Sequence, residues 1–506
     1  MRDADKGTQV TVKSFGIEGA SLIPVTDLTA LLDDLLGRAL TLRELEGAAQ
    51  RITEHYRNRG WFVRVYLPAQ DVTEGQVRIR VIEGRLGGMK LEVPAAPRVN
   101  PDFALGVVGN RLRIGEPLAA AELERGLLLV NDLPGIRVTG ILEAGDVAGE
   151  TRLRVKVEDT PLVTGDLGLN NQGLKTTGIG QATGGFALND LDGRGDRLEL
   201  RGLASEGLAS GLLRYGHPLG NDGARVELRA SHLRYRLGDS FAALDARGQA
   251  TTWGGDLHYP IRRSQNDNLN LTSSLERRES ADDNLGIATR RHEIDSLRLG
   301  LTSDHIDAAW GGGYSQYSLM LTGGDLDLSG VAADLASDQA GPRTQGRYNK
   351  LTVQFARLQR LFADLNLYAG LNAQWADGNL DSSEKHSLGG PHALRAYPVN
   401  EAAGDEGWLL KLELRKEIQP GWQAIAFVEG GGVRLHKAPW VAFTGRNRYT
   451  LTGAGAGLVW NRAGWDARLS VAVPLDDNPG RDANGDNSDG SGQHSARAWA
   501  QLSKRF

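Results

Sequence analysis

The chain has 506 residues, of which 40% are hydrophobic and 24% charged, so it has room for about three domains and is too apolar to be disordered throughout. It contains no cysteine, which excludes disulfides, zinc–thiolate sites and thiol catalysis. A formal net charge of −5 gives no indication of a nucleic-acid partner.

The first residues of the chain, Met1 to Lys6, are polar and lack the apolar core of a signal peptide. No run approaches about 18 consecutive apolar residues, so the sequence predicts no transmembrane helix. A transmembrane barrel passes the same test, because its strands alternate between lipid-facing and lumen-facing side chains. We expect an exported protein whose export signal is missing from this sequence, rather than a cytosolic protein.

Two copies of one pattern occupy the N-terminal third of the chain, over residues 9–84 and 85–160. Each copy reads as a strand, two helices and two strands, which predicts an α+β module. We expect the module boundaries at 1–84 and 85–161. The edge strands of such modules can pair with an incoming extended chain, although both copies can also be structural spacers.

Local signals support this pattern in the first copy. Thr41 and Glu44 form a capping box, whose hydroxyl and carboxylate satisfy backbone N–H groups at the start of a helix. Gly60 is typical of the end of that helix. Apolar and charged residues then alternate over 76–83, which predicts a strand with one buried face.

The rest of the chain, residues 162–506, predicts strands and no helix. Apolar and charged side chains alternate along each segment, as at Leu412 between Lys411 and Glu413. An even number of strands is the rule for single-chain bacterial outer-membrane barrels. We identify sixteen segments, near 163–171, 178–188, 196–204, 208–217, 223–234, 248–259, 267–278, 288–302, 308–323, 346–358, 362–375, 407–418, 422–435, 448–461, 464–475 and 495–506.

The connections between these segments differ in length according to their order. Those after even-numbered segments are short, and those after odd-numbered segments are mostly long, as at 324–345 and 376–406. Outer-membrane barrels have this asymmetry, whereas a soluble β-rich protein has no reason for it. The charged inward face predicts a hydrated lumen. We therefore predict a mixed fold, with two α+β modules followed by a 16-stranded antiparallel transmembrane β-barrel over 162–506.

Two short motifs stand out within the barrel region. The first lies in the long connection at about 376–406 and consists of Leu394, Arg395, Ala396 and Tyr397. The second lies on segment thirteen and consists of Phe427, Glu429 and Gly431.

These motifs and the order of the domains resemble the outer-membrane transporters of two-partner secretion, the TpsB type of the haemolysin activator and secretion family. In that family the modules are called POTRA domains. The first motif is similar to the family's V-R-G-Y/F loop tip, and the second is similar to its F-x-D-x-G motif. The resemblance implies that the loop folds into the barrel and places Arg395 against the wall.

The two motifs also predict a specific contact. Glu429 is expected to face the lumen, because Ala426 and Val428 on the other face of its strand are apolar and suit lipid. A guanidinium can bind a carboxylate through two parallel hydrogen bonds. We predict that Arg395 pairs with Glu429 and pins the loop in the lumen, the alternative being a solvated loop cation. Ala396 stands where the family has glycine, so a positive φ there would be strained.

Other features add less. The terminal Phe506 closes an alternating strand, as in the signal read by outer-membrane assembly machinery, although Lys504 departs from that pattern. We find no catalytic set and predict no enzyme, no metal and no cofactor. Alternating oxygens in one Gly-rich loop would suit calcium, but a solvated acidic loop is the favoured interpretation. They belong to Asp482, Asn484, Asp486, Ser488 and Asp489.

The resemblance implies a transporter in the outer membrane of a Gram-negative bacterium, with its modules in the periplasm, that secretes one dedicated exoprotein of large β-helical type. Its partners would be that client, outer-membrane lipid and, during biogenesis, the assembly machinery, with no nucleic acid. An insertase of the same superfamily and a passive porin are the alternatives. The client is left open among a haemolysin, an adhesin, a contact-dependent toxin and a haem-acquisition protein.

Overall fold

The structure is a computed structural model that describes residues 9–147, 149–482, 484–492 and 495–506. The start of the chain, at which no signal peptide was expected, lies outside these ranges. The chain divides into two compact units, Met1–Thr160 with Asp192–Arg194 and Pro161–Leu191 with Gly195–Phe506. None of the helices in the described ranges combines the length and the apolarity needed to cross a bilayer.

The first module packs its helices on a small sheet. Its strands are β1 (Val10–Thr11), β2 (Ser14–Glu18), β3 (Ala39–Leu40), β4 (Val63–Tyr66) and β5 (Gln76–Glu83), and its helices are α1 (Val25–Ala30), η1 (Asp33–Leu35) and α2 (Leu42–Asn58). The sheet has the order β2-β5-β4, and the pair β2 and β5 is parallel.

The capping box at the start of α2 is confirmed, since Thr41 accepts from the backbone of Glu44 and Glu44 accepts from the backbone of Thr41. The apolar stripe of α2 packs against Val77, Ile79 and Val81 on one face of β5, because alternate side chains of a strand share a face.

Glu83 is a buried charge of this module. It accepts hydrogen bonds from the backbone N–H groups of Ser21 and Leu22, at 2.7 and 2.8 Å, and from the Tyr56 hydroxyl at 2.8 Å. Burial alone would raise the pKa of this carboxyl, but the hydrogen bonds outweigh burial and hold the pKa below its usual value. Glu83 thereby joins the loop before α1 to the end of α2.

The second module repeats the arrangement. It contains β6 (Arg85–Glu92), α3 (Pro101–Val108), α4 (Ala120–Asn131), β7 (Ile136–Ala144) and β8 (Glu150–Asp159). The sheet order is β6-β8-β7, with β6 and β8 parallel. Its core lies between the two helices and the alternating residues Leu153, Val155 and Val157 of β8.

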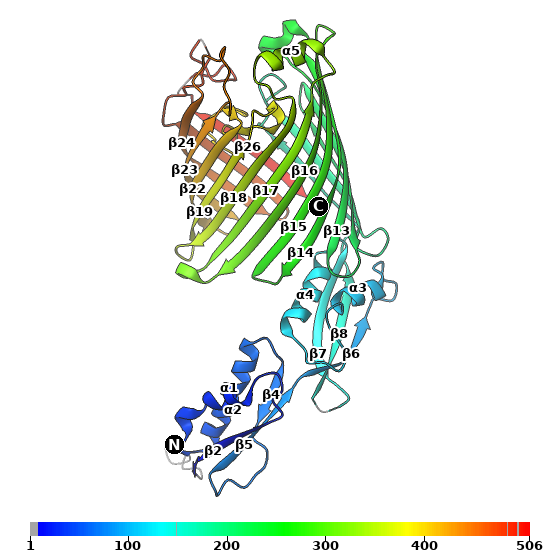
Figure 1. Ribbon diagram of the computed structural model, residues 1–506, viewed down its shortest axis with the longest axis vertical. Helices are drawn as coiled ribbons and strands as arrows, with labels where there is room; N and C mark the ends of the chain where they lie inside the picture. The colour runs from blue at the N-terminus through cyan, green and yellow to red at the C-terminus, as the bar shows by residue number, and fades with distance from the viewer. Residues whose placement is uncertain (1–8, 148, 483, 493–494) are drawn as a thin grey trace. The chain divides into compact units, whose positions relative to one another are not determined.

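The predicted 16-stranded antiparallel barrel is confirmed (Figure 1). Each strand pairs with its neighbours in the chain order of the barrel strands, and β26 pairs with β9 to close the cylinder. The strands are β9 (Val163–Asn170), β10 (Gln181–Asn189), β11 (Arg197–Ala204), β12 (Leu208–Leu219), β13 (Ala224–Arg236), β14 (Arg247–Arg263), β15 (Asp267–Asn284), β16 (Ile287–Asp307), β17 (Gly313–Asp327), β18 (Gly346–Arg360), β19 (Leu365–Ala376), β22 (Glu406–Gln419), β23 (Trp422–Arg434), β24 (Arg448–Arg462), β25 (Trp465–Pro474) and β26 (Arg497–Arg505).

The two faces of the barrel wall differ in chemistry. Leucines line the outward face of the middle strands and are exposed, as a lipid-facing band requires. They include Leu271, Leu275, Leu297, Leu299, Leu301, Leu319 and Leu321. The other face carries the charged residues of the lumen, among which Arg229 and Glu276 pair at 2.8 Å.

We call the end of the barrel at which β9 begins the near end, and the opposite end the far end. The near end has short turns, whereas the far end has the long connections together with two short turns, at 205–207 and 285–286. One far-end connection, between β17 and β18, contains the helix α5 (Ala332–Ala340), which corrects the expectation that no helix follows residue 162. The strand alternation says nothing about a connection, and the alanines of this segment favour a helix between Gly330 and Gly341.

Candidate functional site

The connection between β19 and β22, residues 377–405, turns back into the barrel. It contains η4 (Ser382–Glu384) and two short strands, β20 (His386–Ser387) and β21 (Ala403–Gly404), which pair antiparallel. We call residues 388–402 the tip, and residues 377–387 with 403–405 the base. This is the connection that the sequence analysis expected to fold inward.

The tip is a compact turn that satisfies part of its own backbone. The N–H of Leu394 donates to the carbonyl of Leu388 at 2.7 Å, and the N–H of Tyr397 donates to the carbonyl of Leu394 at 3.1 Å. The N–H of Leu388 donates to the carbonyl of Glu401 at 3.1 Å, which ties the two sides of the tip together. This local bonding allows the segment to leave bulk water, because buried backbone groups need partners.

Apolar side chains of the tip pack against the lumen face of β22 to β25. The tip side chains Leu388, Leu394 and Tyr397 are 0% exposed. Their cluster also contains Ala396, Ala402, Leu409, Phe427, Val433, Tyr449, Leu451 and Ala472. The tip therefore has a small hydrophobic core of its own on one side of the lumen.

Arg395 and Glu429 meet at the centre of this cluster. The Arg395 side chain lies 2.8 Å from Glu429 Oε1, through Nε and through Nη2, and the Arg395 backbone N–H donates to Oε2 at 2.7 Å. The guanidinium lies over the ring of Phe427, 3.4 Å from the ring centroid. The Glu429 side chain is 0% exposed and the Arg395 side chain 11%, so the pair is shielded from water.

A second carboxylate, Glu413 on β22, completes this site and was not singled out in the sequence analysis. Arg395 Nη2 lies 2.5 Å from Glu413 Oε1, and Arg415 donates to the other oxygen of Glu413. Two guanidinium groups thus face two carboxylates, and the balanced charges lower the cost of burial. Glu413 could have been found from the strand pattern, because it faces inward and its strand is the neighbour of β23 in the chain.

Other tip contacts reach β24 and β26. The Tyr397 hydroxyl donates to the carbonyl of Thr452 at 3.1 Å, and Trp499 Nε1 donates to the carbonyl of Arg395 at 2.8 Å. The tip therefore contacts four wall strands through polar groups, counting β22 and β23.

Glycines of the wall admit the tip. A Cβ at Gly453 would lie 2.6 Å from the Cβ of Ala396, and a Cβ at Gly431 would lie 2.8 Å from a methyl group of Leu388. Ala396 is not among the residues with positive φ, so the strain considered for this position does not arise. Left-handed backbone occurs instead at Asn400 and Ala402, with φ of 63° and 55°.

The base has its own ionic contacts, which the sequence analysis did not predict. Glu384, 4% exposed, lies 3.1 Å from Arg278 Nη1 of β15 and 2.9 Å from Lys350 Nζ of β18. Asp405, with a fully buried side chain, lies 3.0 Å from Lys385 Nζ. The partners are far apart in sequence and no shared motif marks them.

A histidine connects the base to α5. His292 Nδ1 lies 3.0 Å from Asp381 of the base, and Nε2 lies 2.7 Å from Asp334 of α5. Both ring nitrogens thus face carboxylate oxygens, an arrangement that favours a proton on each nitrogen. Burial alone would raise the pKa of Asp381, but hydrogen bonds from His292 and Ser383 hold it far below its usual range.

His386, two residues after Glu384 in the base, is a histidine that its surroundings keep neutral. Burial and the nearby Lys350 lower the pKa of this imidazole to about 4. Its buried Nε2 has no hydrogen-bond partner among the described residues.

Two regions singled out in the sequence lie away from this centre. Phe506 exchanges backbone hydrogen bonds with Gly165 of β9, at 2.9 and 3.0 Å, and thus lies at the seam that closes the barrel. In the Asp-rich loop, Asp482 accepts from the backbone N–H groups of Asn484 and Asp486 at 2.9 Å each, so its carboxylate stabilises the turn.

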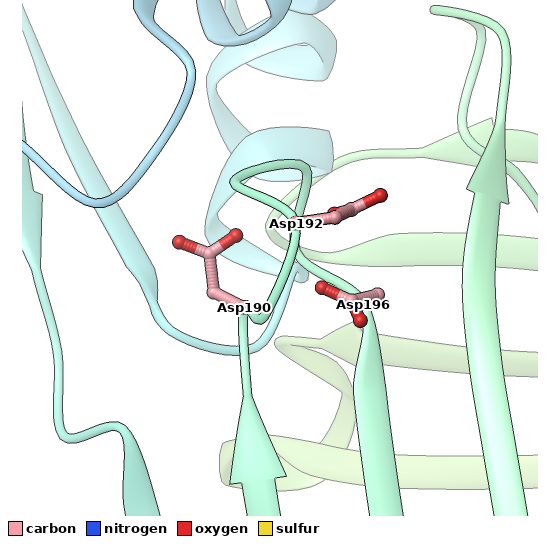
Figure 2. A group of neighbouring side chains, drawn as sticks. All are labelled: Asp190, Asp192 and Asp196. Carbon is pink, nitrogen blue, oxygen red and sulfur yellow. The ribbon is translucent and has the colours of Figure 1, made fainter.

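A different acidic group lies in the near-end turn between β10 and β11, where Asp190, Asp192 and Asp196 offer carboxylate oxygens within 4.8 Å of one another (Figure 2). Each carboxylate accepts from a backbone N–H of the same turn. Asp190 accepts from Gly195 at 2.7 Å, Asp192 from Arg194 at 2.9 Å and Asp196 from Leu191 at 2.7 Å. The group is therefore explained by the fold of the turn.

Comparison with known proteins places this architecture in a family. Residues 149–459 match the family described as haemolysin secretion/activation protein ShlB/FhaC/HecB, and residues 10–84 match the POTRA domain of ShlB type. The chain is 29% identical over 469 residues to the heme/hemopexin transporter protein HuxB of Haemophilus influenzae strain 86-028NP, covering 90% of this chain and 81% of HuxB.

Two further similarities agree with this family. The chain is 25% identical over 498 residues to the outer membrane transporter CdiB of Escherichia coli O6:K15:H31, covering 93% of this chain and 80% of CdiB. The solved structure of CdiB from Escherichia coli has the same fold, with a TM-score of 0.76 at 21% identity over 100% of this chain and 92% of that one.

Proposed function

The chain belongs to the ShlB/FhaC/HecB family of haemolysin secretion/activation proteins, a family of two-partner secretion transporters of the outer membrane, and we propose how it moves its client. The two N-terminal modules lie in the periplasm and receive one dedicated, unfolded exoprotein. The barrel provides a hydrated route to the outside, and Arg395 keeps the in-folded loop seated until a client arrives. The family assignment does not favour an assembly factor or a passive porin.

The observation that carries the proposal is the buried contact of Arg395 with Glu413 and Glu429. Removing one partner of such a site leaves an uncompensated buried charge, at a cost of about 3–5 kcal/mol. A loop held in this way keeps the resting lumen narrow, and a client that displaces it must compensate for these contacts. Folding of the client outside supplies the direction of transport, because no nucleotide chemistry is available at the outer membrane.

Client capture is proposed to use the edges of the module sheets. In the first module β2 and β4 are the two edge strands, and in the second module β6 and β7 are. An extended client segment can add to such an edge through backbone hydrogen bonds, which accept many sequences. A client of heme/hemopexin type is the first to test, because the HuxB relatives are more similar than the CdiB relatives.

The test is secretion in a surrogate Gram-negative host. The chain is expressed with a signal peptide together with the exoprotein encoded beside its gene, and the medium is assayed for that exoprotein. We expect secretion with the wild type and a reduction of tenfold or more with Arg395→Ala. Arg446→Ala, in the far-end loop between β23 and β24, is the matched control and should secrete normally. No secretion from a folded wild-type barrel would contradict the export function for that client.

A further inference from the structure

The tip of the in-folded loop occupies one side of the lumen. Its contacts go to β22 and β23 through Arg395, to β24 through Tyr397 and to β26 through Trp499. A cavity of about 570 Å³ remains between the tip and the lumen face of β16 to β19. His392 of the tip and Lys411 of β22 line it on one side, and side chains of β16 to β19 line it on the other.

Apart from Asp304, the side chains of β16 to β19 that line this cavity are uncharged, and several of them are polar. We call the lumen-facing residues Thr302, Ser318, Gln354 and Asn372 the neutral stripe. They are cross-strand partners in one row, since Thr302 pairs with Ser318, Ser318 with Gln354 and Gln354 with Asn372. At its near-end margin Asp304 accepts from Asn268 at 2.8 Å, so this charge already has a partner.

The neighbouring wall has the opposite character. On β11 to β15 the lumen face carries charged side chains that bind one another, with Arg201 2.7 Å from Glu199, Arg214 2.8 Å from Glu227 and Arg229 2.8 Å from Glu276. Side chains in such pairs offer few free donors to a passing chain. In the neutral stripe, by contrast, Gln354 is exposed to the lumen and Asn372 Oδ1 has no partner among the described residues.

An extended polypeptide needs this kind of surface. Every residue of an unfolded chain except proline presents a backbone N–H and a C=O that require partners away from bulk water. Hydroxyl and carboxamide groups both donate and accept, so they can bind a backbone of any sequence. Neutral partners also bind a client carboxylate or ammonium only weakly, and passage requires sites that are occupied and left again.

We propose that the neutral stripe is the surface along which the extended client enters the barrel, before it displaces the tip from the β22–β26 side. The inference rests on the proposed export function and adds the path. It assigns the charged wall of β11 to β15 to holding the barrel shape, through its internal ion pairs. The tip then need not leave the lumen completely for a segment to begin crossing.

The experiment maps the path by photo-crosslinking. A benzophenone amino acid replaces Ser318, Gln354 or Asn372, and in a matched variant it replaces Ser231, which faces the lumen from β13. The probe is the exoprotein encoded beside the gene, fused to a disulfide-bonded domain that stalls it in the barrel. We expect the three stripe positions to crosslink at least fivefold more than Ser231. Heat-modifiable gel migration checks that each barrel is folded.

The outcomes separate the path from the function. If the unfused exoprotein reaches the medium but the stalled form crosslinks equally or preferentially at Ser231, or at none of the four positions, the path is wrong and export stands. If the wild type secretes nothing, the export function fails and the path with it. A second measurement uses charge: Gln354→Glu with Asn372→Asp should slow secretion at least threefold, whereas Ser231→Asp should leave it unchanged. Equal rates in the two variants would contradict the proposed path.

Discussion

The tip and the base of the in-folded loop are both held by ion pairs, but the loop contributes the cation at the tip and the anion at the base. At the tip the loop contributes the cation, Arg395, and the wall contributes Glu413 and Glu429. At the base the loop contributes the anion, Glu384, and the wall contributes Arg278 and Lys350. A loop polarised in this way has one preferred orientation in the lumen, because reversing it would bring like charges together.

The two ends also differ in how their contacts are distributed. The tip combines its ion pair with a backbone hydrogen bond, an aromatic face and a buried apolar cluster. The base spreads its contacts over several places: Leu380 packs against Ile294 and Leu326, and separate ion pairs go to β15, β16 and β18. Its histidine bridge reaches α5. The tip should therefore be the tightly held end and the base the adjustable end.

The largest effect is expected from Arg395→Glu, which places a third carboxylate between Glu413 and Glu429. We expect the free energy that holds the tip against the barrel wall to fall by at least about 3 kcal/mol, because Glu413 and Glu429 stay buried without a cation. Since the chain has no cysteine, a single cysteine at Ala393 reports on the tip through its maleimide labelling rate. The rate should rise about a hundredfold.

Two controls accompany this change. The double variant Arg395→Glu with Glu429→Arg should recover part of the slow labelling, since it restores one opposite pair. Arg446→Glu makes the same charge change in an exposed loop and should label like the wild type. A double variant that labels as fast as the single variant would contradict a specific pair.

A smaller effect is expected at the base from Glu384→Gln. The carboxamide keeps a weaker acceptor for Lys350, and Arg278 retains Glu276 at 2.9 Å, so we expect a loss of about 1–3 kcal/mol. Hydrogen exchange should accelerate at the β20–β21 pair, while maleimide labelling at Ala393 stays slow. Equal acceleration of both would show that the two ends move as one body and would end the distinction between them.

Gly453→Ala tests the close approach of the tip to β24. The added methyl group would lie 2.6 Å from the Cβ of Ala396, so the backbone of β24 or the tip must shift. Such a shift costs about 1–3 kcal/mol. Labelling at Ala393 should increase about tenfold. Gly430→Ala is the matched control, because a Cβ there would meet its nearest neighbour, Thr452, at 3.6 Å. If both variants label at the same rate, the packing of Ala396 on Gly453 does not hold the tip.

A last effect should come from pH and should fall on the base. His386 has its pKa lowered to about 4 in the folded loop, from 6.5 when solvated. A depressed pKa means that the free loop binds the proton more readily, so seating is strongest above pH 6.5 and weakens as the pH falls toward 4. Labelling of a cysteine at Ser387 should accelerate over this window, and His386→Asn should remove the acceleration. A pH response that persists in His386→Asn would assign it to another group.

Strand alternation was sufficient to predict the sixteen barrel strands, because one face meets lipid and the other meets water. The contact of Arg395 with Glu429 could be anticipated, since both belong to short motifs and the face of Glu429 follows from its neighbours. The contacts of Glu384 and His292 could not, because each of them joins a barrel strand to a connection, and the course of a connection depends on the whole barrel. Helix α5 was missed for a similar reason, since connections carry no periodic signal of membrane position.

Strand length adds one more consequence. A tilted transmembrane strand needs about 9–11 residues, and β9 has 8, whereas β15 has 18 and β16 has 21. In Figure 1 the strands from β14 to β17 rise beyond the rest of the cylinder toward α5. Their outward side chains there turn from leucine to charged residues, including Arg277, Glu293 and Asp295. On the proposed orientation, the strands from β14 to β17 extend the barrel wall outside the cell on one side only. An emerging polypeptide would contact this extended wall on one side and meet open water on the other.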